Sequence, residues 1–378
     1  MSFLLEGITA VTWQQAVMYV VGIILIWLAV KKEYEPSLGF GAILVNLPYS
    51  GVVDQMVQGK VPAAGIIEWL FKTGIEASEA MPILLFIGIG AMIDFGPLLS
   101  QPVLFLFGAA AQFGIFAAIL IACLMGFDLR DAASIGIIGA ADGPTSILVS
   151  QVLGSRYIGP IAVAAYSYMA LVPIIQPFAI HLVTTRKERC IHMEYNPKSV
   201  NRQLRIAFPI AVTMIVGLIS PQSVALVGFL MFGNLLRECG VLGSLSQTAQ
   251  NEFANIITLL LGITISFSMR AEQFVNPATL MIMILGLVAF VFDTIGGVLF
   301  AKLVNVFLKM AGKKPVNPMI GGCGISAFPM SSRVVQKMAA REEPGNIILM
   351  QAAGTNVSGQ VASVIAGGLV ISIVSQYL

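Results

Sequence analysis

An acidic residue, Asp142, stands inside an apolar stretch that is interrupted by glycines and a proline. The segment reads Gly136-Ile-Ile-Gly-Ala-Ala-Asp-Gly-Pro-Thr-Ser146, and the nearest charged residues in sequence are Asp131 and Arg156. A charged side chain inside a membrane costs roughly 2.5–3.5 kcal/mol on insertion scales. Glycine and proline there free backbone groups from helical partners, which is tolerated only where the backbone lines a cavity or is buried in protein. An acid and a broken helix at one place predict a cation site.

A second interrupted segment, from Asn317 to Arg333, could supply further ligands. Sodium prefers hard oxygen ligands, and the candidates are the side chains of Asp142, Thr145, Asn317, Ser326 and Asn356 together with freed backbone carbonyls. Half-helix C-terminal ends favour cations and N-terminal ends favour anions, so two breaks that face each other would supply both kinds of site. Arg333 would suit a carboxylate because its guanidinium can bind two oxygens at once.

Each of these residues also has a plainer interpretation. Asp142 could cap the second half-helix, since Asp-Gly-Pro favours a turn. Arg333 could extend to the cytoplasmic surface, and Tyr166 and Tyr168 could belong to an aromatic belt at the membrane surface. Asn356 could serve close helix packing.

The composition is that of a membrane protein. The chain has 378 residues, of which 57% are hydrophobic and only 11% are charged, and its mean hydropathy is +0.89. Soluble domains carry about 25% charged residues. We therefore expect an all-α polytopic membrane protein. The net charge of +2 gives no indication of a nucleic-acid partner. Four scattered cysteines without a CxxC pair and two histidines without ligand spacing give none of a transition metal.

The apolar segments predict about ten or eleven transmembrane helices, the shortest of them being re-entrant or interfacial. The first runs from about 17 to 30 and ends at Lys31-Lys32 rather than at a cleavage site, so we expect it to be retained. Residues 65–72 are typical of an interfacial amphipathic piece. The one long polar connection, Thr184 to Arg205, is basic, which predicts a cytoplasmic location and a hinge between two halves.

The two halves contain similar motifs in the same order. In each half a glycine-containing apolar segment is followed by a proline, a long apolar stretch and a glycine-rich break: Gly88–Asp94, Pro102 and Gly136–Ser146 in the first, and Gly262–Ser268, Pro277 and Met319–Ser326 in the second. Paired breaks at corresponding places are the best sequence indication of a transporter site. Chance similarity between glycine-rich membrane segments is the alternative.

These motifs resemble the β subunit of the biotin-dependent sodium-pumping decarboxylases, which include oxaloacetate, methylmalonyl-CoA, glutaconyl-CoA and malonate decarboxylases. The likeness extends over nearly the whole chain, through the segments Gly39–Asn46, Ala91–Leu99, Gly139–Thr145, Asn317–Arg333 and Gly354–Gly359. The chain lacks an extended N-terminal region, which makes it more similar to the acyl-CoA decarboxylase subunits.

The resemblance implies a function and roles for individual residues. The subunit would decarboxylate carboxybiotin delivered by a biotin carrier subunit, couple this to Na+ export, and consume a proton from the outer side. Asp142 would serve sodium binding and proton movement, and Tyr168 is implicated in the chemistry. Arg333 would lie at the carboxybiotin end, with Ser326 beside it. The ion sites would include Asn317, Gly321 and Ser326.

The resemblance also implies an architecture and partners. We expect two inverted repeats with broken helices in an elevator-type scaffold and core, divided as 1–77 scaffold, 78–184 first repeat core, 185–205 cytoplasmic connection, 206–250 scaffold helices and 251–378 second repeat core. The expected partners are the biotin carrier, a carboxyltransferase α subunit, a small membrane subunit of the γ or δ type and further copies of this chain, in a bacterial inner membrane. The functional alternatives are a sodium-coupled secondary transporter of an organic anion and a structural subunit without chemistry.

Overall fold

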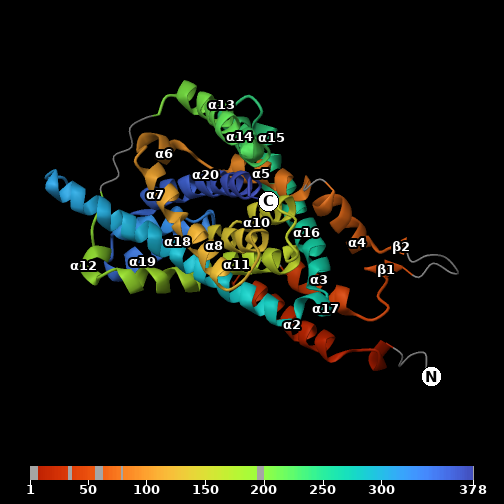
Figure 1. The fold of residues 1–378 in the computed structure, drawn as a ribbon. Helices are drawn as coiled ribbons and strands as arrows, with labels where there is room; N and C mark the ends of the chain where they lie inside the picture. Colours follow the sequence, from red (N-terminus) through yellow and green to blue (C-terminus); the bar gives the residue numbers. More distant parts are fainter. Residues whose placement is uncertain (1–6, 33–35, 56–62, 78–79, 194–199, 378) are drawn as a thin grey trace.

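Helices dominate the chain, as expected for an all-α polytopic membrane protein (Figure 1). The computed structural model describes residues 7–32, 36–55, 63–77, 80–193 and 200–377, so residues 194–199 of the basic connection lie outside the described residues. The only strands in these ranges are β1 (Asp54–Gln55) and β2 (Ala63–Ala64), which pair antiparallel.

The helices of the two halves follow one another in a similar order. The first half contains α2 (Trp13–Lys32), α3 (Ser37–Asn46), α4 (Ile66–Phe71), η1 (Lys72–Glu76), α5 (Ala80–Met92), α6 (Gly96–Ser100), α7 (Leu104–Ala111), α8 (Phe113–Leu124), α9 (Leu129–Gly136), η2 (Ile137–Ala140), α10 (Gly143–Val152) and α11 (Ile158–Val183). After α12 (Arg186–Arg189) the second half contains α13 (Arg202–Ile219), η3 (Pro221–Ser223), α14 (Val224–Glu238), α15 (Gly243–Thr248), η4 (Ala249–Phe253), α16 (Ala254–Ile265), η5 (Ser266–Met269), α17 (Ala271–Phe274), α18 (Pro277–Met310), η6 (Pro318–Gly324), α19 (Met330–Glu342) and α20 (Leu349–Val374).

Fewer helices are long enough to cross a membrane than the ten or eleven expected. Among the described residues six helices are long and apolar enough, or up to eight if each of two bent pairs is one span. One bent pair is α11, which turns by 73° between Met169 and Leu171. Pro173 lies four residues after Met169 and cannot donate the hydrogen bond that would continue the helix there. Several other apolar segments, such as α9 and α10, form helices that are shorter than a membrane span.

The first glycine-rich break forms the tip of a re-entrant hairpin. Helix α9 passes into the 3-10 segment η2, Ala141 takes a left-handed conformation (φ 53°), and α10 leads back. The two ends of the hairpin are fastened to each other by Asp131, which is buried. Its Oδ1 accepts from Ser155 Oγ (2.8 Å), and its Oδ2 accepts from Arg156 Nη2 (3.1 Å) and Nε (3.3 Å). Entry and exit therefore lie side by side, and the chain reverses at Asp142.

The second break forms another hairpin, entered through η6 and left through α19. Its two ends meet at the backbone carbonyl of Ile191, which accepts from Asn317 Nδ2 (3.0 Å) and Asn346 Nδ2 (3.3 Å). The tips of the two hairpins touch, since the Ser326 amide donates to the Ala140 carbonyl at 2.9 Å. Two interrupted segments far apart in sequence are thus brought to one place.

Two asparagines stabilise further chain breaks in the two halves. Asn46, at the end of α3, donates from Nδ2 to the Met269 carbonyl (2.8 Å) and accepts the Ala271 amide (2.7 Å), so it bridges the gap between η5 and α17. Asn234 in α14 donates to the Ile93 carbonyl (2.9 Å), where the chain leaves α5. Buried side-chain amides thus replace the helical partners that these breaks remove.

The carboxylate of Asp131 is expected to hold the base of the first hairpin. Replacing it in the Asp131→Ala variant removes hydrogen bonds to a charged acceptor, each of which typically contributes about 1.5–3 kcal/mol. We expect a thermal unfolding midpoint lower by several degrees in detergent. The control is Asp128→Asn, because Asp128 is exposed and its side chain caps nothing at the start of α9. Equal midpoints for the two variants would contradict this role.

Candidate functional site

The carboxylate of Asp142 lies at the tip of the first hairpin and is buried, with 3% of the residue exposed. It occupies the N-cap position of α10. Its Oδ2 accepts from Thr145 Oγ1 at 2.7 Å, Gln360 Nε2 at 3.3 Å and Ser363 Oγ at 3.4 Å. None of the salt bridges among the described residues involves Asp142, so a buried acid is surrounded by neutral donors alone. A negative charge in this position requires a cation or a proton.

Ser326 connects the second hairpin to the same cluster. Its hydroxyl donates to Ser363 Oγ and to the Gly359 carbonyl (3.2 Å). Hydroxyl groups both donate and accept, so those that now donate to the carboxylate can turn lone pairs towards a bound cation. Asp142, Thr145, Ser326, Gln360 and Ser363 are referred to below as the Asp142 cluster.

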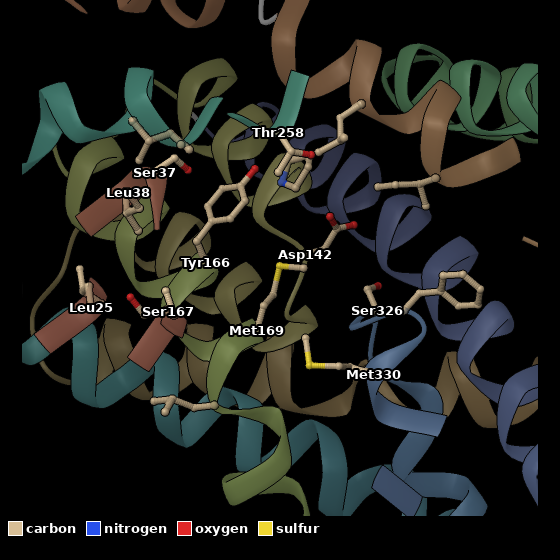
Figure 2. A pocket seen from close by; sticks show the side chains of 18 of the residues that line it. Leu25, Ser37, Leu38, Asp142, Tyr166, Ser167, Met169, Thr258, Ser326 and Met330 are labelled. Carbon is tan, nitrogen blue, oxygen red and sulfur yellow. The ribbon is translucent and has the colours of Figure 1, made fainter. Parts of the chain in front are cut away.

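A cavity of about 550 Å³ opens beside the Asp142 cluster. Figure 2 shows Asp142 and Ser326 on one side of it and Tyr166, Thr258 and Ser37 on the other. Its remaining wall is largely apolar and comes from α2, α3, α5, α11 and α16. The cavity therefore offers a largely apolar space with a carboxylate on one side and scattered hydroxyl and amide groups around it.

Side-chain amides from three helices or helix ends hold the unwound backbone of the second hairpin. They donate to four consecutive carbonyl groups: Gln176 to Gly322 (2.9 Å), Asn356 to Cys323 (3.2 Å) and Ile325 (2.7 Å), and Gln112 to Gly324 (3.3 Å). All three residues are buried, and the amide oxygen of each has no hydrogen-bond partner among the described residues. Asn356 therefore keeps a free oxygen, as its predicted role in sodium binding requires, but its hydrogen bonds also position the hairpin.

Two predicted sodium ligands lie elsewhere in the second hairpin. Asn317 is at its base, where Nδ2 donates to the Arg189 (2.8 Å) and Ile191 carbonyls and Oδ1 caps η6 through the Met319 amide. Gly321 is packed against α18, and a Cβ there would lie 2.1 Å from the Gly297 carbonyl oxygen. Neither residue has a hydrogen bond to the Asp142 cluster among the described residues, and both shape the hairpin that carries Ser326.

The two tyrosines of α11 face different surroundings. Tyr168 is buried, and its hydroxyl donates to the Met283 carbonyl of α18. Tyr166 lines the cavity, and its ring lies so close to Gly143 that a Cβ there would be 2.5 Å from it. The structure thus places Tyr166, rather than Tyr168, next to the residue that follows Asp142.

Arg333 lies in the first turn of α19 and is exposed. Its side chain forms no ion pair with the described residues, although its neighbours Arg186 and Arg189 do. The guanidinium is thus available to an anion from outside. It belongs to the helix whose first residue, Met330, lines the cavity.

A further buried carboxylate, Asp293, was not predicted as a site residue because it lies within the long continuous helix α18. Its Oδ1 accepts the Ile115 amide at 3.1 Å, near the first residues of α8, where the helix dipole favours an anion. Its Oδ2 lies against Gly139, so a Cβ added at Gly139 would be only 2.8 Å from this oxygen. Asp293 thus accepts a backbone amide through Oδ1, whereas its Oδ2 has no hydrogen-bond partner among the described residues.

Two members of the Asp142 cluster were not predicted as site residues. Gln360 and Ser363 stand four and seven residues after Asn356, on the same face of α20. That spacing within the polar stretch after Gln351 was the signal that could have identified them. Spacing alone marks a shared helix face, and tertiary packing decides that this face of α20 meets Asp142.

Two hairpins that meet beside a cavity, with a buried acid where their tips touch, are features of a polytopic membrane protein with a candidate ion site. The family described as Na+-transporting oxaloacetate decarboxylase beta subunit matches residues 14–374, and the chain belongs to this family. The resemblance stated from the sequence is confirmed.

Relatives with three different named substrates are similar over almost their whole length. The chain is 44% identical to the methylmalonyl-CoA decarboxylase subunit beta of Veillonella parvula, covering 98% of this chain and 96% of the relative. It is 44% identical to the glutaconyl-CoA decarboxylase subunit beta of Acidaminococcus fermentans, with the same coverage. It is 40% identical to the probable oxaloacetate decarboxylase beta chain of Vibrio cholerae, covering 97% of each.

The contact between Gly321 and Gly297 tests whether Gly321 acts through packing. The Gly321→Ala variant places a methyl group against a backbone carbonyl, and such overpacking typically costs about 1–3 kcal/mol or more. We expect a lower thermal unfolding midpoint and a lower yield of folded protein. Gly243→Ala is the control, since nothing lies within 4 Å of a Cβ at that position. An unchanged midpoint for Gly321→Ala with weaker sodium binding would favour a direct ion role instead.

Proposed function

We propose that the chain is the membrane subunit of a sodium-pumping decarboxylase, which decarboxylates carboxybiotin and couples this reaction to Na+ export with uptake of a proton. The family membership and the names of the relatives support this proposal. The single structural observation that carries it is the buried Asp142 carboxylate, which is surrounded by neutral donors and open to a cavity.

Asp142 is the exchange ligand for Na+ and H+ in this proposal. The carboxylate binds either a proton or a sodium ion, so that no unpaired negative charge is left in the membrane. Thr145 and Ser326 supply hydroxyl oxygens to the sodium ion, and Asn356 an amide oxygen. When sodium replaces the proton, the released proton is available to the biotin nitrogen, which needs one when its bond to the carboxyl carbon breaks and CO2 leaves.

The largely apolar cavity suits the decarboxylation step. Water stabilises the carboxylate of carboxybiotin, and its transfer to a dry space removes part of that stabilisation and favours loss of CO2. Arg333 binds the incoming carboxylate before it enters, and Ser326 contacts it at the cavity. Tyr168 acts from α11 by holding the α18 wall through the Met283 carbonyl.

An elevator movement of a core with two inverted repeats would transfer the ion across the membrane. The similar order of elements in the two halves and the meeting hairpin tips support this arrangement. The core comprises 78–184 and 251–378, the scaffold comprises 1–77 and 206–250, and 185–205 connects the halves at the cytoplasmic side. Export of one cation against about 100 mV costs about 2.3 kcal/mol, which the decarboxylation must supply through this movement.

The partners follow from the proposed chemistry, because carboxybiotin has to be loaded and delivered. A biotin carrier subunit brings carboxybiotin, a carboxyltransferase α subunit loads it, and a small γ- or δ-type membrane subunit and further copies of this chain complete a complex in the bacterial inner membrane. A sodium-coupled organic-anion transporter is not favoured, since the relatives are named as decarboxylase subunits.

The proposed role of Asp142 is tested with the Asp142→Asn variant of the purified complex in proteoliposomes. The amide carries no negative charge to balance a sodium ion. If the sodium-binding free energy falls by about 2.8 kcal/mol, binding weakens about 100-fold. We expect at least that loss of sodium affinity, measured as the Na+ dependence of CO2 release, together with loss of 22Na+ transport. The exposed Asp128→Asn substitution serves as the matched control. Normal sodium dependence of Asp142→Asn would disprove the assignment.

Ser363 is expected to support the same ion site from α20. In the Ser363→Ala variant Asp142 and Ser326 lose a shared hydroxyl, and loss of such a supporting group typically weakens metal binding by about 10- to 100-fold. Ser358→Ala is the control on the same helix, since that hydroxyl donates to the Leu104 carbonyl and faces α7. Similar sodium affinities for the two variants would show that Ser363 plays no part.

A further inference from the structure

A stripe of three basic residues, Arg333, Lys337 and Arg341, runs along one side of α19 and is called the α19 stripe below. The residues are spaced by four, which places them on neighbouring turns of one helix face. All three are exposed. Within the described part of the chain none of their side chains forms an ion pair, although several nearby basic residues do.

The acids nearest to the stripe are already engaged with other bases. Glu342 accepts from Arg189 Nε at 2.7 Å and also lies 3.6 Å from Arg186. Burial raises the pKa of Glu342, but the hydrogen bond and charge of Arg189 outweigh this and hold it below its ordinary value. The Oε1 atom of Glu343 lies 2.9 Å from Nε2 of His192. Neither acid forms an ion pair with a residue of the stripe.

An uncompensated row of like charges has a cost, because positive side chains one helical turn apart repel each other. The stripe lies on the side of the molecule that carries the basic connection, since α12 packs against α19 and Arg189 binds Glu342. Figure 1 shows α12 and α19 together at one end of the molecule. A surface of this kind attracts a negatively charged partner.

The α19 stripe leads to the cavity that contains Asp142. Helix α19 begins at Met330, which lines the cavity together with Phe328 (Figure 2). At a rise of 1.5 Å per residue, Lys337 lies about 10 Å and Arg341 about 16 Å further along the helix axis. A protein that contacts the stripe thus sits near the end of the cavity that Met330 lines, without filling the cavity.

We propose that the α19 stripe is the docking surface for an acidic face of the carrier protein that delivers carboxybiotin. This inference rests on the proposed function and adds to it the place and the chemistry of docking. Lys337 and Arg341 attract and orient the carrier, whereas Arg333, nearest to the cavity, receives the carboxylate of its biotin.

The test uses the complex purified without its carrier, placed in nanodiscs of neutral lipid and supplied with the carboxylated carrier subunit. The variant is Lys337→Glu combined with Arg341→Glu, and CO2 release is measured against carrier concentration at about 50 and about 200 mM KCl, which changes the screening length. We expect the KM for the carrier to rise at least about tenfold, kcat to change by less than about twofold, and the salt dependence of KM to weaken, as is typical of charges that steer association.

A matched control carries the same charge change at Lys309 and Lys313, exposed residues at and beyond the end of α18, and should keep the wild-type KM. The neutral variant Lys337→Gln combined with Arg341→Gln should show an intermediate KM, which separates lost attraction from added repulsion. An unchanged KM in both stripe variants would overturn the docking proposal.

A different binding partner would also show itself. If the KM rises only in nanodiscs that contain anionic lipid, the stripe binds lipid headgroups and the docking proposal is wrong. If the wild-type complex releases no CO2 from the carboxylated carrier at all, the proposed function itself fails. These two failures are distinguishable because the first leaves wild-type turnover intact.

Discussion

The need to satisfy backbone groups at helix breaks inside a membrane governs this structure. A freed carbonyl or amide finds no water in the hydrocarbon region, so it must bind to protein. At the second break, side-chain amides from the α7–α8 junction, α11 and α20 donate hydrogen bonds to four consecutive backbone carbonyls. At the tips, the Ser326 backbone amide donates a hydrogen bond to the Ala140 carbonyl. The unwound segments are thus held in one geometry by long helices, and this fixed frame is what allows a buried carboxylate to be placed between them.

Three buried acids illustrate how differently one charge can be accommodated. Asp131 is paired with Arg156 and fastens a hairpin base. Asp293 accepts a backbone amide near the start of α8. Asp142 accepts from neutral groups, and it alone of the three lines the cavity. Asp131 is stabilised as an anion by the guanidinium of Arg156, whereas Asp293 keeps one carboxylate oxygen without a hydrogen-bond partner among the described residues. Burial alone therefore does not mark a candidate ion site, and access to the cavity distinguishes Asp142.

The sequence predicted the positions of the helix breaks, because glycine, proline and polar residues occur together there within apolar segments. Glycines and a proline around Asp142 located the first break, and the Asn317–Arg333 segment located the second, because few other residues tolerate such turns. It was uninformative about side-chain direction. Asn317 stands at the far end of its hairpin from Ser326, and Gly321 faces α18. The contributions of Gln360 and Ser363 depend on which face of α20 meets Asp142, and tertiary packing decides that.

The second hairpin links the Asp142 cluster to the basic face of α19. Its tip contributes Ser326 to the Asp142 cluster through Ser363, and its outgoing arm, α19, begins a few residues later and carries Arg333. Any change in the position of the tip is transmitted directly to α19, since a helix of this length behaves as a stiff rod on this scale. The base is held at Ile191, within the connection between the two halves. In the proposed function, an ion at Asp142 and an anion at Arg333 would both act on this one hairpin, and a shared structural unit with different affinities in its two states is the physical requirement for coupling them.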